Sequence, residues 1–467
     1  MKNIIQLLLV LTIYSTATFA QNNTEATKLA HQMADALYKT ANLPGLSVAV
    51  MKDGKIIYAE GFGYADIEKK IPVTTATQFR TASVGKVITA TAIGKLVQEG
   101  KLDLEAVVQQ YVPEFPVKEF PITIRQLAGH LSGLPHYNDK DKLENRFYPS
   151  VKDALSVFAH EPLLSKPGTK YSYSTHGFTL LSAAIEKASG KNYLDYMKTN
   201  VFLPLGMNST GPDLRANPSK NMSTLYNMTN GIPEKEKQSE DPSYKWAGGG
   251  LISTPTDLVK MAEGYFNGFL KPQTADTLFK SQLLASGRET QVGIGWRISQ
   301  DVDGRMVRDH SGSMGGARSV ISIYPEQHVA IAIMTNAQWS SMTEETAQMM
   351  MIPFLSGSTK TDLPQWNFKL QVSFLSGKNE KTFSDGTITL NGSTGSLTIS
   401  AGFTEKKTMQ LIQLEKNRYA WIRPDAICYL EIESKDNKLT GKAIAYGTQL
   451  NHNPLTNPPF MEFVSIN

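Results

Sequence analysis

The chain has 467 residues, of which 41% are hydrophobic and 19% charged, so it can bury a large core and is long enough for two domains. Its formal net charge of +4 is small for this length, and no run of Lys or Arg is interleaved with aromatic residues, which argues against nucleic-acid binding. The single cysteine, Cys428, excludes an intrachain disulfide framework, and the 8 histidines lack metal-binding spacings, so we expect neither a metal nor a cofactor.

The first 20 residues have the layout of a cleavable secretory signal. Lys2 precedes an apolar run, Ile4–Ile13, and small residues end at Ala20, so we expect the mature chain to begin at Gln21. An uncleaved membrane anchor is the alternative, but the run is too short to span a bilayer. We therefore expect an exported protein, periplasmic or secreted, with no transmembrane segment after cleavage.

The mature chain begins with a helix and a hairpin. Apolar residues recur at helical spacing over Thr24–Thr40, and Pro44 ends that pattern. Leu46–Met51 and Lys55–Ala59 are typical of two strands joined by a tight turn. Because a large helical region then precedes further strands, the sequence predicts an α+β fold: an antiparallel sheet flanked by helices, with an inserted all-helical region.

Ser83 and Lys86 start the next helical pattern, and their spacing puts a hydroxyl and an amine on one helical face. A desolvated amine can lose its own proton and then accept the serine proton, which would activate the hydroxyl. Composition alone would give roughly two Ser-x-x-Lys matches by chance, and the chain contains one. It stands at the first turn of a helix closed by Gly100, where unpaired N–H groups would stabilise an oxyanion.

Three further segments carry candidate groups or surround them. His130 follows a short helix and is either catalytic or a residue that fixes its loop. Tyr171 and Tyr173 precede an apolar helical run; a phenol near two cations can ionise below its usual pKa, whereas the alternative is a packing role for both. The glycine-rich bend Trp246–Asp257 lacks the lysine of a phosphate loop, so we expect backbone packed close to a cleft.

The segment Met306–Gly316 contains the single His-x-Gly of the chain, His310-Ser311-Gly312. We expect strands over Val292–Ile298, Ser319–Ile323 and Val329–Met334 around it. On a strand edge facing Ser83, its backbone N–H groups would hold a substrate carbonyl; the alternative is an ordinary hairpin turn.

The C-terminal part has a different character. The polar stretch 356–365 is typical of a linker, and 366–467 is rich in strand signals, such as Thr387–Leu390 and Ser396–Ile399, with turn signals at Asp385-Gly386 and Asn391-Gly392. It carries no catalytic set that we recognise. The predicted organisation is a signal at 1–20, a main domain at 21–355, a linker at 356–365 and a small all-β domain at 366–467.

Taken together and in order, Ser83-x-x-Lys86, Tyr173-Ser174-Thr175 and His310-Ser311-Gly312 resemble the motifs of the serine β-lactamase and penicillin-binding-protein superfamily, in its class C-like branch. The resemblance runs from about residue 30 to about residue 350 and implies a β-lactamase/transpeptidase-like fold. It also implies that Ser83 is the nucleophile, that Lys86 and Tyr173 exchange its proton, and that the N–H groups of Ser83 and Ser313 form an oxyanion hole. The substrate side of the cleft would be lined by His310, Ser311, Gly312, Ser313 and Thr175.

Two departures from the family pattern bear on substrate. Class C β-lactamases usually have Tyr-x-Asn, whereas this chain has Thr175 at the third position and so lacks the amide. Tyr265-Phe266-Asn267 also matches Tyr-x-Asn, but it comes at the wrong place in the order of motifs and is interpreted as a chance match. His310 stands where β-lactamases usually have Lys, and a neutral His attracts a β-lactam carboxylate less than a permanent charge does. Histidine at this position looks like the D-peptidase, D-aminopeptidase, esterase and mitochondrial β-lactamase-like members, and Tyr-Ser-Thr resembles the last of these.

The sequence therefore predicts an exported serine acyl-hydrolase that acts through an acyl-enzyme on an amide or ester, such as a D-amino-acid peptide. Peptidase or esterase action is favoured over efficient β-lactamase action. The alternatives are a β-lactamase, a non-catalytic sensor that binds penicillin-like ligands, and a chain whose C-terminal domain binds a glycan or protein. The partner is expected to be a small-molecule or peptide substrate, and the oligomeric state is not predicted.

Overall fold

The structure is a computed structural model of the chain. It describes residues 25–137, 145–237, 239–340, 342–355, 366–375, 381–391, 394–399, 407–415, 417–422, 427–436, 438–446 and 461–466. These residues form two compact units, one made of Asn42–Glu344 and the other of the described residues before and after that range. The predicted signal (1–20) and linker (356–365) lie outside the described residues, so the predicted domain boundaries stay predictions.

The first unit is built on a seven-stranded antiparallel sheet. The strand order means that β1 and β12, from opposite ends of the unit, pair at the centre, with Leu46 opposite Thr335. The strands in sheet order are β3 (Ile71–Pro72), β2 (Lys55–Asp66), β1 (Gly45–Lys52), β12 (Val329–Thr335), β11 (Ala317–Tyr324), β10 (Met306–Met314) and β9 (Arg297–Gln300).

The predicted hairpin near the start of the chain is confirmed. Asp53 and Gly54 join β1 to β2 with φ values of 48° and 73°, the left-handed pair that a tight hairpin turn requires. Glycine takes the second position without a Cβ penalty.

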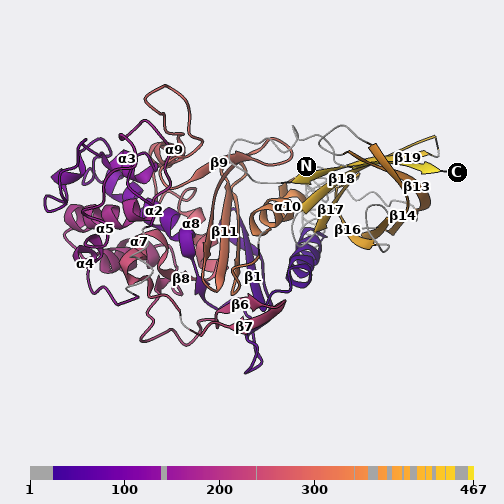
Figure 1. Ribbon diagram of the computed structural model, residues 1–467, viewed down its shortest axis with the longest axis horizontal. Helices are drawn as coiled ribbons and strands as arrows, with labels where there is room; N and C mark the ends of the chain where they lie inside the picture. Colours follow the sequence, from indigo (N-terminus) through magenta and orange to yellow (C-terminus); the bar gives the residue numbers. More distant parts are fainter. Residues whose placement is uncertain are drawn as a thin grey trace, which may run out of the picture. The chain divides into compact units, whose positions relative to one another are not determined.

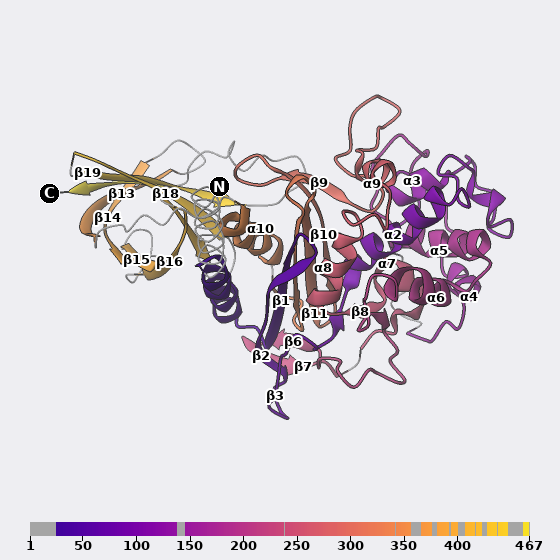
Figure 2. The ribbon, with the colours of Figure 1, turned by 180° about the vertical axis from the view of Figure 1, so that it is seen from behind.

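Helices fill the chain between β2 and β9 and gather on one side of the sheet (Figures 1 and 2). α2 lies at the centre of the core, and nearly all of its side chains are buried, because it is covered by sheet and helices together. These elements are η1 (Ala82–Val84), α2 (Gly85–Gln98), η2 (Val108–Gln110), α3 (Ile124–Ala128), α4 (Val151–Leu155), α5 (Thr175–Ser189), α6 (Tyr193–Met197), η3 (Lys198–Phe202), η4 (Pro242–Lys245), α7 (Trp246–Gly249), α8 (Pro255–Glu263) and α9 (Pro272–Phe279). The α+β prediction with an inserted helical region is confirmed.

A second, three-stranded sheet joins the nucleophile segment to the glycine-rich bend. Its order is β4 (Phe79–Arg80), β8 (Leu251–Ser253) and β5 (Gly211–Pro212). Thr254 caps α8 as its sequence pattern predicts, with its side chain accepting from the Asp257 N–H. A further hairpin, β6 (Tyr226–Thr229) and β7 (Ile232–Lys235), lies beside the end of β2.

The strand predicted at Val292–Ile298 is wrong for most of its length. β9 begins only at Arg297, because Gly295 has φ 75° and breaks the extended backbone. Ile294 and Trp296 are fully buried, so the apolar alternation that suggested a strand reflects a buried turn.

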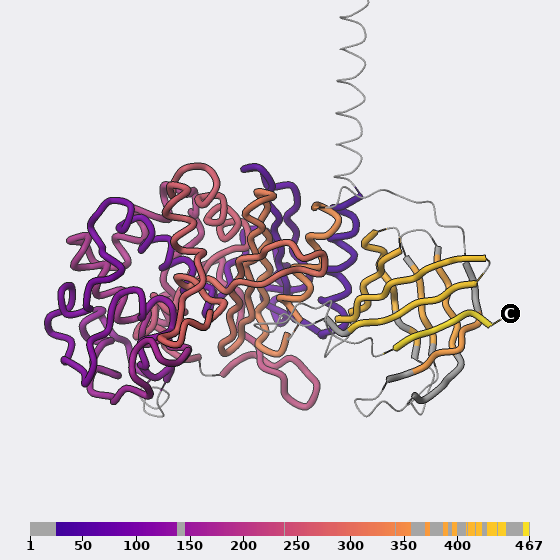
Figure 3. The backbone as a smooth tube through the Cα atoms, turned by 90° about the horizontal axis from the view of Figure 1, so that it is seen from above, coloured from indigo at the N-terminus to yellow at the C-terminus, as the bar shows by residue number. Residues whose placement is uncertain are grey.

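The second unit contains a helix over residues 25–40, α10 (Thr343–Leu355) and a closed barrel of eight consecutive antiparallel strands. The all-β prediction for the C-terminal part is confirmed, although the turn predicted at Asp385-Gly386 lies inside β14, paired with Gln371 and Leu370. The strands, which run side by side in Figure 3, are β13 (Trp366–Leu375), β14 (Lys381–Asn391), β15 (Thr394–Ile399), β16 (Lys407–Glu415), β17 (Arg418–Ile422), β18 (Ile427–Lys435), β19 (Lys438–Tyr446) and β20 (Met461–Ile466).

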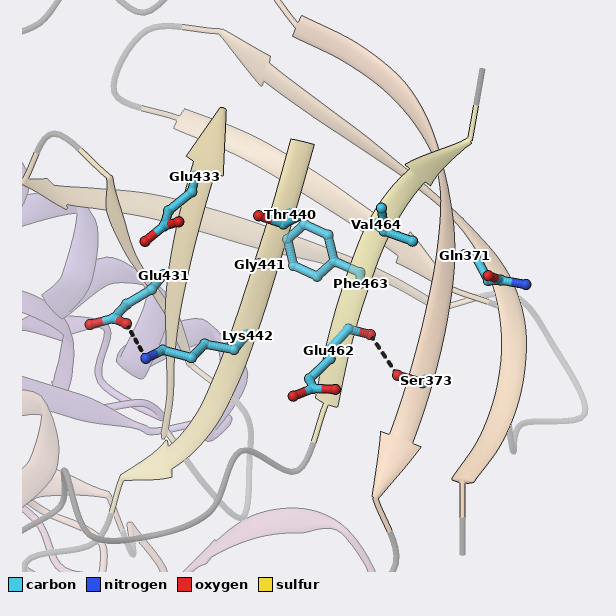
Figure 4. A pocket seen from close by; sticks show the side chains of 10 residues that line it. All are labelled: Gln371, Ser373, Glu431, Glu433, Thr440, Gly441, Lys442, Glu462, Phe463 and Val464. Atoms are coloured by element: carbon cyan, nitrogen blue, oxygen red, sulfur yellow. Dashed lines mark hydrogen bonds and ion pairs between the residues drawn. The ribbon is translucent and has the colours of Figure 1, made fainter. Parts of the chain in front are cut away.

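The outer face of the barrel carries a cavity of about 420 Å³ across β13, β18, β19 and β20 (Figure 4). Lys442 lies in it between carboxylates and pairs with Glu431 at 2.7 Å. The residues that line it include none of those predicted for catalysis. None of the helices in the described ranges has the length and apolar character of a membrane span.

Removing Asp213 is expected to destabilise the first unit strongly. Arg80 Nε lies 2.7 Å from Asp213 Oδ2 and both side chains are nearly inaccessible, so Asp213→Ala leaves a buried cation unpaired, a loss of about 3–5 kcal/mol. The matched control is Glu105→Ala, which breaks the exposed Glu105–Arg125 pair and should change stability by less than about 1 kcal/mol. Urea unfolding followed by fluorescence measures both; equal midpoints for the two variants would contradict the assignment.

Candidate active site

Ser83 lies in η1, directly before α2. The residue before it, Ala82, has φ 43°, a left-handed conformation that residues with a Cβ rarely adopt. Two contacts hold this turn: the Thr81 N–H donates to the Leu251 carbonyl at 2.8 Å, and Gly249 packs so closely that a Cβ there would lie 3.1 Å from the Ala82 carbonyl. The backbone that presents Ser83 is therefore fixed by its neighbours.

Lys86 is fully buried on the first turn of α2, with Nζ 3.3 Å from Ser83 Oγ. The same nitrogen lies 3.0 Å from Thr175 Oγ1 and donates to the Gly248 carbonyl at 2.7 Å. Burial, and then the positive charge of Lys245, hold the pKa of Lys86 well below its usual range. A neutral amine has two hydrogens and one lone pair. When the Gly248 carbonyl and the Thr175 hydroxyl accept the two hydrogens, the lone pair is left for the Ser83 proton.

Tyr173 completes the group around Ser83. Its hydroxyl lies 3.5 Å from His310 Nε2, its ring centroid is 4.8 Å from Lys86 Nζ, and its interaction with the Ser83 side chain acts to lower its pKa. Burial raises the pKa of Tyr173 above its usual value, and the bond to Ser83 opposes this only in part. The expectation that neighbouring cations ionise this phenol is therefore wrong for the free protein, because desolvation disfavours the phenolate more than the cations favour it.

His310 is neutral and has a defined tautomer. Its Nδ1 lies 2.7 Å from the Ser311 carbonyl oxygen, which only accepts, so Nδ1 carries the hydrogen and Nε2 accepts from Tyr173. Burial, followed by the charges of Arg297 and Lys86, holds the pKa of His310 well below its usual value. Burial thus lowers the pKa of both nitrogen bases of the site, Lys86 and His310.

His130 packs behind Tyr173. The two ring centroids are 4.4 Å apart, and His130 Nδ1 accepts from the Ser174 N–H at 3.1 Å. The Ser172 N–H donates to the His130 carbonyl at 2.8 Å. Of the two interpretations of His130, the geometry supports a residue that fixes the loop.

The third motif lies on an open strand edge. β10 pairs with β11 through Met314, but with β9 only over Met306–Asp309, so the part from His310 onward has one edge turned toward η1. Gly312 makes this approach possible, because a Cβ there would lie 2.8 Å from the Ser83 nitrogen and 2.5 Å from the Thr81 carbonyl. The next residue, Ser313, is exposed. The strand edge predicted beside Ser83 is therefore present, and the oxyanion role of the Ser83 and Ser313 N–H groups stays a prediction.

Two predicted substrate-side residues have their hydroxyls engaged inside the protein. Thr175 is fully buried and contacts Lys86, and Ser311 bonds through its side chain to Glu344, which also pairs with Arg318 at 3.2 Å. Their contacts with a substrate stay predictions. Tyr265, in the Tyr-x-Asn segment set aside as a chance match, is a buried packing residue whose hydroxyl accepts from Trp296 Nε1 at 3.0 Å.

Sequence reasoning missed Arg297. Its Nε donates to Asp309 Oδ1 at 2.7 Å, while its buried Nη2 has no hydrogen-bond partner among the described residues. Its charge acts on both Tyr173 and His310. A permanent cation therefore lies beside the neutral imidazole. Its position follows from the strand register, which places Arg297 opposite Asp309 and cannot be read from the sequence alone.

No cluster of His, Cys, Asp and Glu side chains suited to a metal ion occurs in the part of the chain that the structure describes.

Comparison with known proteins extends these observations. A family model described as Beta-lactamase matches residues 28–349. The chain is 30% identical over 410 residues to the serine beta-lactamase-like protein LACTB, mitochondrial, of Homo sapiens, with 66% of this chain and 73% of that protein covered. It is 28% identical over 320 residues to penicillin-binding protein 4* of Bacillus subtilis (strain 168), with 64% and 69% covered.

Solved structures confirm the fold. The octameric penicillin-binding protein homologue from Pyrococcus abyssi matches with a TM-score of 0.61 and 23% identity, over 94% of this chain and 99% of that chain. A D-amino acid amidase from Ochrobactrum anthropi SV3 matches with a TM-score of 0.60 and 21% identity, over 71% and 99%. The resemblance inferred from the three motifs is confirmed.

The burial of Lys86 predicts a pH-dependent stability difference between the protein and its Lys86→Met variant. Folded Lys86 has a lowered pKa and unfolded Lys86 an ordinary one, so unfolding takes up a proton between the two values. In that window the free energy of unfolding of the wild type rises with pH relative to Lys86→Met, by up to about 1.4 kcal/mol per pH unit. Urea titrations of both proteins from pH 6 to 10 measure the difference. A constant difference would show that Lys86 is charged when folded.

Proposed function

The chain belongs to the beta-lactamase family of serine hydrolases, and we propose that it is an exported acyl-serine hydrolase in which Ser83 attacks an amide or ester carbonyl. The observation that carries the proposal is the buried Lys86 amine, with its lowered pKa, 3.3 Å from Ser83 Oγ and beside an open strand edge. These are the parts that nucleophilic catalysis needs: a nucleophile, an adjacent base and donors for the oxyanion.

In acylation, the Ser83 proton passes to Lys86 Nζ as Oγ bonds to the carbonyl carbon. The N–H groups of Ser83 and Ser313 hold the resulting oxyanion, and such donors typically contribute a hundredfold or more to the rate. When the tetrahedral intermediate collapses, the neutral Tyr173 phenol gives its proton to the leaving amine or alcohol. The proton on Lys86 then restores the phenol, so no net charge remains in the buried site.

In deacylation the same groups act in the reverse direction. Water enters where the leaving group was and gives its proton to the Tyr173 oxygen as the phenol passes its own proton to Lys86 Nζ. That proton then goes from Lys86 to the Ser83 oxygen as the acyl bond breaks. His310 Nε2 accepts from the Tyr173 hydroxyl and keeps the phenol oriented between these steps.

The substrate class follows from the charges beside His310. Arg297 supplies a permanent positive charge with a free Nη2, whereas His310 itself is neutral. A substrate with a carboxylate close to the scissile bond is therefore favoured. We propose substrates of the D-amino-acid peptide type, whose C-terminal carboxylate this cation would attract, with esters and β-lactams as the alternatives, and export of the chain after cleavage near Ala20.

Ser83→Ala is expected to abolish covalent labelling. Wild-type protein exposed to an activated ester, a D-Ala-D-Ala peptide or a chromogenic cephalosporin should gain the acyl mass in at least one case, and Ser83→Ala should gain none. Intact-protein mass spectrometry measures this. If the wild type shows neither an adduct nor turnover with any of these probes, the chain is a non-catalytic binding protein.

Arg297 is expected to select for the carboxylate. Wild type should hydrolyse a peptide with a free C-terminal carboxylate faster than its C-terminal amide, by tenfold or more for a contact worth about 1.4 kcal/mol. Arg297→Gln combined with Asp309→Asn, which avoids leaving the buried Asp309 carboxylate without its cation, should remove the preference, while Arg297→Lys keeps part of it. An unchanged carboxylate-to-amide ratio of kcat/KM in the double variant would overturn the assignment.

A further inference from the structure

His136 lies at the end of the loop that begins at His130, and neither the motifs nor the proposed mechanism assigns it a role. Its side chain is half-buried, and its Nδ1 accepts from the Thr175 N–H at 3.2 Å. The centroid of the same ring lies 5.0 Å from that of Tyr173, with the two ring planes at 78°. His136 therefore contacts both the first and the third residue of the Tyr-Ser-Thr motif.

The loop that ends at His136 is bound to the Tyr-Ser-Thr segment at several points. His130 Nδ1 accepts from the Ser174 N–H at 3.1 Å, and His136 Nδ1 accepts from the next N–H along the chain. The Ser174 hydroxyl donates to the Pro135 carbonyl at 2.7 Å. Both N–H groups stand at the start of α5, where the helix itself offers no carbonyl to accept them. Two histidine rings from one loop supply the acceptors instead.

The same two rings contact the Tyr173 ring from two directions. His130 lies against it with the centroids 4.4 Å apart and the planes at 34°, while His136 meets it nearly at a right angle. Contacts of this kind limit the rotation of the tyrosine side chain about its two torsions. The hydroxyl at the end of that ring lies 3.5 Å from His310 Nε2, and Lys86 Nζ lies over the ring. A small rotation would therefore move the phenol proton away from the groups that exchange it.

Histidine suits this position because it accepts a hydrogen bond without a negative charge. A ring nitrogen that accepts carries no hydrogen, so Nδ1 is the unprotonated nitrogen of the His136 ring. A carboxylate could accept from the same N–H, but its charge would favour the protonated form of a nearby amine. The hydroxyl of Thr175 lies 3.0 Å from Lys86 Nζ. The start of α5 is thus held beside Lys86 without a negative charge that would keep a proton on the amine.

We propose that His136 is a positioning residue for Tyr173, which holds the phenol where its proton reaches the leaving group of the substrate. The inference rests on the proposed function, in which Tyr173 is the general acid of acylation. An alkoxide or an amide anion is too basic to leave without a proton, whereas a nitrophenolate leaves unaided. Loss of His136 should therefore impair acylation by a substrate with a basic leaving group far more than acylation by an activated ester.

The test compares the ethyl ester and the p-nitrophenyl ester of N-acetyl-D-alanine, which share an acyl group and differ in the leaving group. His136→Leu should lower kcat/KM for the ethyl ester by about tenfold or more relative to the nitrophenyl ester, since general acid catalysis contributes about 10²–10⁴-fold. His136→Asn, whose amide oxygen can accept from the Thr175 N–H, should restore most of the wild-type ratio. Tyr173→Phe should show the same selective loss as His136→Leu.

Equal losses with both esters in His136→Leu would assign the residue a purely structural role and overturn the inference, as would a wild type that hydrolyses only the nitrophenyl ester. Urea midpoints show whether each variant is folded. If His136→Leu is not, His136→Phe takes its place, because it keeps a ring against Tyr173 and removes the acceptor. If the wild type forms no adduct and hydrolyses neither ester, the proposed function fails as well.

Discussion

The candidate active site depends on the burial of the Lys86 amine. Lys86 has no exposed surface, and removing a charged ammonium from water is strongly unfavourable, so the group is driven toward its neutral form. Hydrogen bonds to Thr175 and Gly248 then fix which way its lone pair points. The same burial that makes the site difficult to build lowers the pKa of Lys86, which favours the role of base proposed for it.

Close backbone packing is the second requirement, and glycine makes it possible. Gly249 lies against Ala82, Gly312 against Ser83, and a Cβ at Gly248 would lie 2.6 Å from Thr175 Cγ2. These glycines come from segments far apart in the sequence. They allow the nucleophile turn, the bend before β8 and the edge of β10 to meet within van der Waals distance. The left-handed Ala82 is stable only because this packing surrounds it.

The sequence was sufficient to predict features that depend on the spacing of neighbouring residues or on the order of motifs along the chain. The spacing of Ser83 and Lys86 predicted a shared helical face, and the order of the three motifs predicted the family. The prediction failed at Val292–Ile298, where apolar residues alternate as they do in a strand. The left-handed φ of Gly295, which interrupts the extended backbone there, is not visible in a hydrophobic pattern. Sequence reasoning also missed Arg297, whose significance comes from register and long-range packing. The raised pKa of Tyr173 is likewise a property of burial and not of neighbouring residues in the sequence.

The charges of the site form a repeated arrangement. Two bases with lowered pKa values, Lys86 and His310, each lie within the influence of a basic side chain, and each of these side chains is held by a carboxylate: Lys245 by Glu240, and Arg297 by Asp309. In each case a basic side chain disfavours a proton on the neighbouring base. Donors and cations placed before the reaction are also what the oxyanion of the proposed acylation needs, because they stabilise the negative charge as it develops on the carbonyl oxygen.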